Sequence, residues 1–228
     1  MQSVLVTDFD GTITEGDFYI LAVERLLKPE DLAPWQEYRA GRITHFTALK
    51  TIFAKIRAPE SVVLDILKDM RPDPRLPECA ARLKAAGWHV AVASAGCGWY
   101  INRILDGLGV DFEVHANPGR YLEGGPLVME APVDSPFYSR QAGVDKAGIV
   151  RFYQERGARV AYAGDGYTDY EAASIVPAHL RYARANLAES LRGKGEEFRS
   201  FSVWSEIVDS LLQPPASNRD RMIEPSYL

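Results

Sequence analysis

Three short apolar runs, each ending in small or acidic residues, constrain the fold of this chain more than any other feature of its sequence. They are VLVTDFDG at residues 4–11, HVAVASAG at residues 89–96 and RVAYAGDG at residues 159–166. The second and third runs follow amphipathic stretches that close with glycine, at residues 78–87 and 146–157. Strands buried on both faces read as continuous apolar runs, and intervening helices allow such strands to run in parallel. The sequence therefore predicts an α/β fold with a doubly wound parallel sheet.

The stretch between the first two runs has the periodicity of helices. At residues 44–56 and 60–70, apolar side chains recur on one helical face, and Thr44 is the predicted N-cap of the first of these helices. The proline-rich segment at residues 71–77 marks a stiff return to the core. A small all-helical cap inserted after the first strand is therefore expected. The predicted division is a core of residues 1–15 and 73–213, a cap of residues 16–72 and a C-terminal tail of residues 214–228.

A second irregular region follows the strand at residues 89–96. FEVHAN at residues 112–117 and YLEGGPLVMEAP at residues 121–132 are expected to form a β-hairpin or flap. The two glycines at positions 124 and 125 favour a turn between its arms.

The bulk properties narrow the partners and the compartment. The net charge of −5 provides no reason to expect nucleic acid, which binds basic surfaces. No apolar stretch of about 18 residues is present to cross a membrane, and the N-terminus lacks the pattern of a signal peptide. Cys79 and Cys97 have no metal-ligand spacing and are interpreted as reduced thiols. A cytoplasmic protein is expected, with the oligomeric state left open between monomer and homodimer.

Polar side chains gather where the three predicted strands end. In an open α/β sheet, ligands bind beyond the carboxyl ends of the strands, so these side chains are expected to share one crevice. Carboxylates about 4 Å apart repel by about 4 kcal/mol at an effective dielectric constant near 20, and Mg²⁺ relieves that repulsion through its preference for oxygen ligands. The predicted cluster comprises Asp8, Asp10, Ser94, Asp165 and Asp169, with Lys146 opening a nearby helix.

This cluster has the groups that phosphoryl transfer requires. One carboxylate beside Mg²⁺ can attack phosphorus and form an aspartyl phosphate, and a second can protonate the leaving alkoxide and later activate water. Asp8 and Asp10, two residues apart on one extended segment, suit these two roles. Gly11 lets the backbone approach phosphoryl oxygens, and Ser94 supplies a hydroxyl donor.

DFDGTIT, the strand that ends in Ser94, Lys146 and GDGYTD together resemble the haloacid dehalogenase-like phosphatases, in order and spacing, over residues 4 to 175. The resemblance implies a Mg²⁺-dependent phosphatase that hydrolyses a small phosphate ester. It implies that Asp8 is the nucleophile and Asp10 the acid/base. The remaining implied roles are Mg²⁺ binding by Asp8, the Asp10 carbonyl and Asp165, phosphate binding by Gly11, Ser94, Ala95 and Lys146, and support of the lysine or a metal-bound water by Asp169.

The helical insertion resembles the cap of the phosphoserine-phosphatase-like subgroup. By this resemblance Asp17 and Thr168 are substrate-specificity positions, where those enzymes carry glutamate and asparagine. Ile52 stands near the place of the arginine that holds the substrate carboxylate, so that anchor is missing. GRIT…TIF also resembles the methionine-salvage phosphatase that acts on 2-hydroxy-3-keto-5-methylthiopentenyl-1-phosphate. The substrate therefore stays open.

Simpler interpretations stand beside these. Asp17 or Ser94 can serve as a helix N-cap. Several residues near the motifs are expected to have no functional role: Trp99 and Tyr100 as packing residues, Arg181 and Arg184 as surface residues, and His45, His89, His115 and His179 as residues without a metal. The alternative functions are a phosphotransferase with the same chemistry and a catalytically silent binding protein on the same fold.

Overall fold

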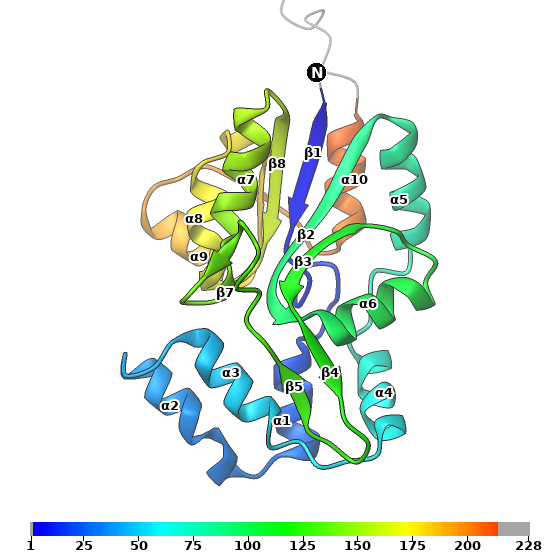
Figure 1. The fold of residues 1–228 in the computed structure, drawn as a ribbon. Coiled ribbons are helices and arrows are strands. Elements are labelled where there is room, and N and C mark those ends of the chain that lie inside the picture. Colours follow the sequence, from blue (N-terminus) through cyan, green and yellow to red (C-terminus); the bar gives the residue numbers. More distant parts are fainter. Residues whose placement is uncertain (1, 214–228) are drawn as a thin grey trace, which may run out of the picture.

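A six-stranded parallel sheet forms the centre of the molecule in this computed structural model, which describes residues 2–213 (Figure 1). The strand order is β10-β9-β8-β1-β2-β3, so the chain starts at the centre, winds to one edge and then returns to wind to the other. This order confirms the doubly wound sheet and puts its switch point between β1 and β8. The strands are β1 (Ser3–Thr7), β2 (Trp88–Cys97), β3 (Glu113–Asn117), β8 (Arg159–Gly164), β9 (Arg181–Ala183) and β10 (Arg199–Ser200).

Helices cover both faces of the sheet (Figure 1). Each helix buries the apolar stripe that its sequence carries, and the two faces have separate hydrophobic clusters, with Leu5 in one and Val6 in the other. Alternate residues of β1 thus point to opposite faces of the sheet, and both faces are buried. The helices α5 (Leu76–Ala85), α6 (Gly98–Gly107) and α10 (Trp204–Leu212) contribute to the first cluster, and α7 (Lys146–Glu155), α8 (Tyr170–Ser174) and α9 (Ala185–Gly193) to the second.

The segment after β1 is helical, as predicted, and lies beyond the carboxyl ends of the strands (Figure 1). Thr44 is the N-cap of its third α-helix, where its hydroxyl accepts a hydrogen bond of 3.1 Å from the Thr47 amide. The apolar faces of these helices pack together around buried Ile52 and Ile66. The helices are α1 (Phe18–Leu26), the 3₁₀ turn η1 (Pro29–Leu32), α2 (Ala33–Arg39), α3 (His45–Phe53) and α4 (Glu60–Asp69).

The prediction for the second irregular region is partly wrong. FEVHAN does not join a hairpin but forms β3, the sixth strand of the main sheet, where Val114 pairs in parallel with Val92 of β2. A parallel pair needs a crossover helix, and α6 supplies it. The hairpin instead joins β4 (Gly119–Tyr121) to β5 (Leu127–Met129).

The β4–β5 hairpin supports the cap. The Tyr121 hydroxyl donates a hydrogen bond of 2.6 Å to the Ala58 carbonyl, and a Cβ on Gly125 would lie 2.2 Å from the Ile56 carbonyl oxygen. The hairpin therefore meets the backbone of the cap through the Tyr121 side chain and through its own backbone at Gly125. A second small hairpin pairs β6 (Tyr138–Ser139) with β7 (Gly143–Val144), just before α7.

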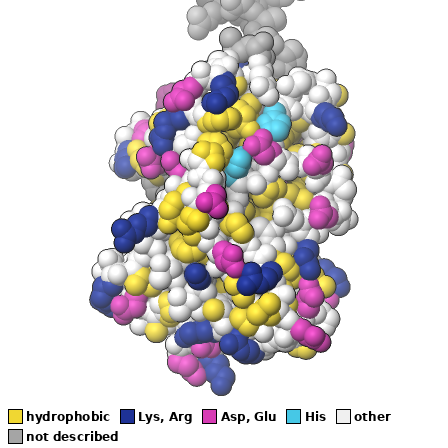
Figure 2. All heavy atoms as spheres, viewed as in Figure 1, with side chains coloured by type: hydrophobic (Ala, Val, Ile, Leu, Met, Phe, Trp, Pro, Cys, Tyr) yellow, Lys and Arg dark blue, Asp and Glu magenta, His cyan; other side chains and the backbone are white. Residues whose placement is uncertain are grey.

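Acidic and basic side chains are interspersed on the face in Figure 2. Within residues 2–213, no helix has both the length and the apolar character needed to span a bilayer. The predicted tail at residues 214–228 lies outside the described residues.

Candidate active site

A cavity of about 770 Å³ lies where β1, β2 and β8 end, between the sheet and the cap helices. The structure brings nearly all of the predicted site residues to its wall, although they come from four separate segments of the chain. Asp169 is the exception, because it is fully buried behind the wall. The predicted residues that line the cavity are Asp8, Asp10, Gly11, Asp17, Ser94, Ala95, Lys146, Asp165 and Thr168.

Asp8 follows β1 directly, and its carboxylate is held at both oxygens. Oδ1 accepts a hydrogen bond of 2.7 Å from the Phe9 amide, and Oδ2 lies 2.8 Å from Nζ of Lys146. Burial and the charge of Asp169 raise the pKa of Asp8, while Lys146 opposes that rise. The Asp8 side chain is thus held in one orientation, but the positive charge of Lys146 does not offset the effects of burial and of Asp169 on its pKa.

Lys146 is a buried cation placed between two carboxylates. Its Nζ lies 2.6 Å from Oδ1 of Asp169 as well as 2.8 Å from Asp8. Burial alone would lower the pKa of Lys146, but Asp169 and Asp8 outweigh it and the net shift is upward. Lys146 therefore stays charged at the base of the cavity.

Asp169 organises the β8 loop as well as the lysine. Its Oδ1 also accepts a hydrogen bond of 2.5 Å from the Tyr162 hydroxyl, and its Oδ2 accepts from the amides of Asp165 and Gly166 at 3.1 and 2.8 Å. A carboxylate with this many donors is satisfied within the protein. Asp169 consequently acts on the site by holding Lys146 and the segment that carries Asp165.

Asp10 has its own environment, two residues from Asp8. Its Oδ1 accepts a hydrogen bond of 3.0 Å from the Phe18 amide, at the start of α1, and its Oδ2 accepts one of 2.6 Å from the Tyr100 hydroxyl. Burial and then the charge of Asp17 raise the pKa of Asp10 to about 7, although both hydrogen bonds lower it. A carboxyl group with a pKa near neutrality can both give and take a proton.

The expectation that Tyr100 only packs is therefore wrong. It does stack on Phe18, with ring centroids 4.5 Å apart, but its hydroxyl reaches Asp10 across the cavity wall. A Cβ on Gly96 would lie 1.9 Å from that hydroxyl, so the glycine makes the approach possible. Trp99, in contrast, does pack, with its ring 5.2 Å from that of Tyr121.

Gly11 brings the first loop against the β8 loop. Its φ is +67°, and a Cβ there would lie 2.5 Å from Oδ2 of Asp165. Thr12 donates a hydrogen bond of 3.2 Å to Oδ1 of the same carboxylate. Burial and then the charge of Asp169 raise the pKa of Asp165 to about 7, since Lys146 compensates only partly.

Arg181 and Arg184 are not the surface residues that were expected. Arg184 lines the cavity, and its guanidinium donates to the carbonyls of Gly11 at 2.5 Å and Thr14 at 3.1 Å. Arg181 is buried and forms an ion pair of 2.8 Å with Glu196. The guanidinium groups of both arginines donate hydrogen bonds to backbone carbonyls that have no partner within their own loop or helix end. The local sequence around the arginines does not predict these contacts.

The acidic cluster fits a hard divalent cation. One carboxylate oxygen from each of Asp8, Asp165 and Asp169 lies within 4.8 Å of the others. Because Asp169 is saturated by its donors, Asp8 and Asp165 are the two that need a positive charge. Mg²⁺ typically takes one or two carboxylates with water and phosphate oxygens as its other ligands, so the donor set suits it.

Ser94 and Ala95 lie in the last part of β2, where the pairing with β3 is irregular. Ser94 does not cap a helix, because α6 begins at Gly98 and the Ser94 hydroxyl accepts a 3.0 Å hydrogen bond from the Gly96 amide. Its hydroxyl proton remains to be donated into the cavity.

The cap contributes Asp17 and a mostly uncharged wall. Asp17 is the N-cap of α1, where Oδ1 accepts from the Tyr19 amide at 2.7 Å and the Ile20 amide at 3.3 Å. It also lines the cavity, so its capping and its position in the wall are compatible. The rest of the cap wall is formed by Gly16, Tyr19, Ile20, Leu21, Trp35, Tyr38, His45, Leu49 and Phe53.

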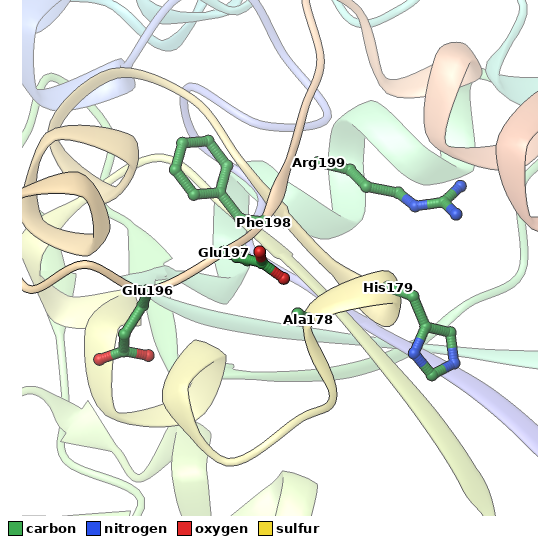
Figure 3. A pocket seen from close by; sticks show the side chains of 6 residues that line it. All are labelled: Ala178, His179, Glu196, Glu197, Phe198 and Arg199. Atoms are coloured by element: carbon green, nitrogen blue, oxygen red, sulfur yellow. The ribbon is translucent and has the colours of Figure 1, made fainter.

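A second pocket, of about 470 Å³, lies on the surface between Ala178 and Arg199 (Figure 3). Figure 3 shows its side chains spread in different directions instead of converging, with Glu196 and His179 pointing away from one another. Glu196 is also engaged with Arg181. The predicted motifs contribute nothing to it, so the cavity under the cap is the candidate active site.

The family follows from comparison with known proteins. A family model described as haloacid dehalogenase-like hydrolase matches residues 5–174. Because the match spans well over half of the chain, the chain belongs to this family, and the predicted family, fold class and assignment as a hydrolase are confirmed.

Individual relatives are more distant. The 2-hydroxy-3-keto-5-methylthiopentenyl-1-phosphate phosphatase of Exiguobacterium sibiricum is 26% identical over 214 residues, which covers 91% of this chain and 95% of the relative. The enzyme of the same name from Geobacillus kaustophilus is 26% identical over 92% of this chain and 96% of its own length. A solved substrate-bound phosphoserine phosphatase complex superposes with a TM-score of 0.65 and 19% identity, over 92% of this chain and 98% of that chain, which shows the shared fold.

Proposed function

We propose that this hydrolase is a Mg²⁺-dependent phosphatase that removes phosphate from a small-molecule monoester through an aspartyl phosphate on Asp8. The observation that carries the proposal is the position of the Asp8 carboxylate. It lies 2.8 Å from Nζ of Lys146 and close to a second carboxylate, Asp165, and both carboxylates would be stabilised by a bound cation. The phosphatase names of the relatives support the same reaction class. We also propose that residues 16–72 act as the cap and the surrounding residues as the core.

The proposed roles follow from the geometry. Lys146, the Ser94 hydroxyl and the backbone at Gly11 and Ala95 would hold the phosphate oxygens. An oxygen of Asp8 attacks phosphorus, the bond from phosphorus to the ester oxygen breaks, and Asp10 gives its proton to that oxygen.

Asp10 also serves the second half of the reaction. It takes a proton from a water molecule whose oxygen attacks phosphorus, and the bond between phosphorus and Asp8 breaks. Free phosphate and the original carboxylate result. Bound to Asp8, Asp165 and the Asp10 carbonyl, Mg²⁺ would neutralise charge on the carboxylates and the phosphoryl group.

The position of the cap favours a small substrate, because the cap covers the cavity on the side opposite to the sheet and limits the size of what can enter. Phosphoserine and 2-hydroxy-3-keto-5-methylthiopentenyl-1-phosphate are the two candidates that the names of similar proteins provide. Asp17 and Thr168 are the proposed specificity positions. A phosphotransferase that uses a second alcohol in place of water has the same residue requirements, and competition between water and added alcohols would separate the two.

The direct test is hydrolysis of p-nitrophenyl phosphate by the wild type and by Asp8→Asn. We expect turnover that needs Mg²⁺, stops with EDTA and falls at least 1000-fold in the variant, as is typical for loss of a nucleophile. Asp134→Asn, in an exposed loop, is the matched control and should retain wild-type turnover. Undiminished turnover by Asp8→Asn would refute the nucleophile, and no turnover of any phosphate ester by the wild type would favour a silent binding protein.

A further inference from the structure

The cap wall of the cavity contains no basic side chain. Of the Lys and Arg residues within 2–213, the two that line the cavity are Lys146 and Arg184, both from the core and both engaged by carboxylates or carbonyls. In the cap, Lys50 is exposed and Arg57 donates to the Ala54 and Ile56 carbonyls. A carboxylate on the leaving group would therefore meet no cation from the cap.

Acids from the cap and from the neighbouring core disfavour negative charge beside this wall. Asp17 and Asp10 both line the cavity, and Asp17 lies close enough to raise the pKa of Asp10. A leaving group that carries its own carboxylate would be desolvated beside these acids without a partner. An uncharged leaving group avoids that cost and suits the rings of Tyr19, Trp35 and Phe53.

His45 is a polar side chain in this wall, and one of its ring nitrogens has no hydrogen-bond partner among the described residues. It is the first residue of α3, and its ring lies edge-on to Trp35 and Tyr38, with centroids 5.7 and 5.3 Å away. Its Nδ1 is buried and has no hydrogen-bond partner within the part of the chain that the structure describes. Because Nδ1 is closed to solvent, a group in the cavity that His45 lines would reach the imidazole through its other ring nitrogen, Nε2.

The imidazole is also neutral. Burial and then the nearby charge of Lys146 lower the pKa of His45 to about 4. Five acids also line the cavity and would favour the charged form: Asp8, Asp10, Glu15, Asp17 and Asp165. Burial and Lys146 are the larger influences on the pKa of His45. A neutral imidazole has one N–H donor and one acceptor nitrogen, which match a hydroxyl or carbonyl oxygen.

Resting on the proposed phosphatase function, we infer that His45 is a specificity-determining residue that hydrogen-bonds an uncharged hydroxyl or carbonyl oxygen of the leaving group. The substrate class is then the phosphate ester of a neutral, partly apolar alcohol, such as a ketose 1-phosphate with an uncharged arm. Amino-acid phosphates are discriminated against because their carboxylate would meet no cation from the cap, even though an acid such as Asp17 could pair with their ammonium group.

The test compares kcat/KM for four esters: p-nitrophenyl phosphate, fructose 1-phosphate, dihydroxyacetone phosphate and phosphoserine. The wild type should prefer the better of the two neutral sugar-type esters to phosphoserine by at least tenfold. His45→Phe keeps a ring in the wall but removes the hydrogen bond. The ratio of kcat/KM for that neutral ester to that for p-nitrophenyl phosphate should fall roughly 5- to 100-fold, the equivalent of one hydrogen bond in a buried site. His45→Gln, which can still donate and accept, should restore part of the ratio.

Matched controls separate recognition from folding. His179→Phe, an exposed histidine outside the cavity, should leave the ratio unchanged, and all variants should melt cooperatively. A preference for phosphoserine, or equal losses on every ester in His45→Phe, would overturn the inference while leaving the phosphatase proposal intact. A wild type that hydrolyses none of the four esters would contradict the phosphatase proposal itself, and the role of His45 would fall with it.

Discussion

The metal-free site should make the stability of this protein fall as pH rises, and Asp165→Asn isolates one source of that fall. The pKa of Asp165 is raised from 3.8 to about 7 in the folded chain, mainly by burial. The folded state therefore keeps a proton that the unfolded state releases near pH 4. That stabilisation is present at low pH and is lost as pH rises through about 7.

The magnitude follows from the two pKa values. At pH 5 the unfolded carboxyl group has already lost its proton, while the folded group lies about 2 units below its pKa. At about 1.4 kcal/mol per unit, this is worth roughly 3 kcal/mol relative to pH 8. Because the side chain is partly exposed to the cavity, solvent screening reduces the expectation to about 1–2 kcal/mol.

The assay is urea denaturation at pH 5 and pH 8 in EDTA, for the wild type and Asp165→Asn. His45 has an opposite pH dependence below pH 6.5, but it is the same in both proteins and cancels in the comparison. The wild type should lose about 1–2 kcal/mol more than the variant between the two pH values. At pH 8, Mg²⁺ should stabilise the wild type and have little effect on the variant.

Two results would refute this reasoning. Equal pH slopes in the wild type and Asp165→Asn would mean that Asp165 does not hold a proton in the folded state. Equal stabilisation of both proteins by Mg²⁺ at pH 8 would mean that the cation binds elsewhere.

Two further substitutions test how the site is held together. Lys146→Met removes the cation shared by Asp8 and Asp169, which lie 2.8 and 2.6 Å from Nζ of the lysine. We expect turnover of p-nitrophenyl phosphate below 0.1% of wild type and a loss of about 3–5 kcal/mol in the free energy of unfolding. Turnover above a tenth of wild type would contradict the role of the lysine. Tyr100→Phe removes a hydrogen-bond donor that lowers the pKa of Asp10. The pH profile of kcat for an alkyl phosphate should therefore move to higher pH. An unmoved profile would show that Tyr100 does not lower the pKa of Asp10.

The sheet side of the cavity was predictable because most of its residues follow buried strands, and strand ends in such a sheet converge by geometry. The hairpin prediction failed at β3 because an edge strand is only partly buried, so FEVHAN lacks the continuous apolar run of the central strands. Arg184 was missed for a different reason. It serves carbonyls of Gly11 and Thr14, about 170 residues earlier in the chain, and carbonyls leave no trace in the sequence.

The two acids of DFDGTIT illustrate the limit most clearly. Their spacing suits a nucleophile and an acid/base, and the family resemblance implies which is which. Their different environments depend on distant partners, with Lys146 beside Asp8 and the Tyr100 hydroxyl on Asp10. The other oxygen of Asp10 accepts from the Phe18 amide, the first residue of the first cap helix. The cap therefore holds the proposed proton-transfer group as well as covering the cavity. A substitution that shifts the start of α1 should alter the acid/base step along with substrate choice, which a cap that only selects substrates would not do.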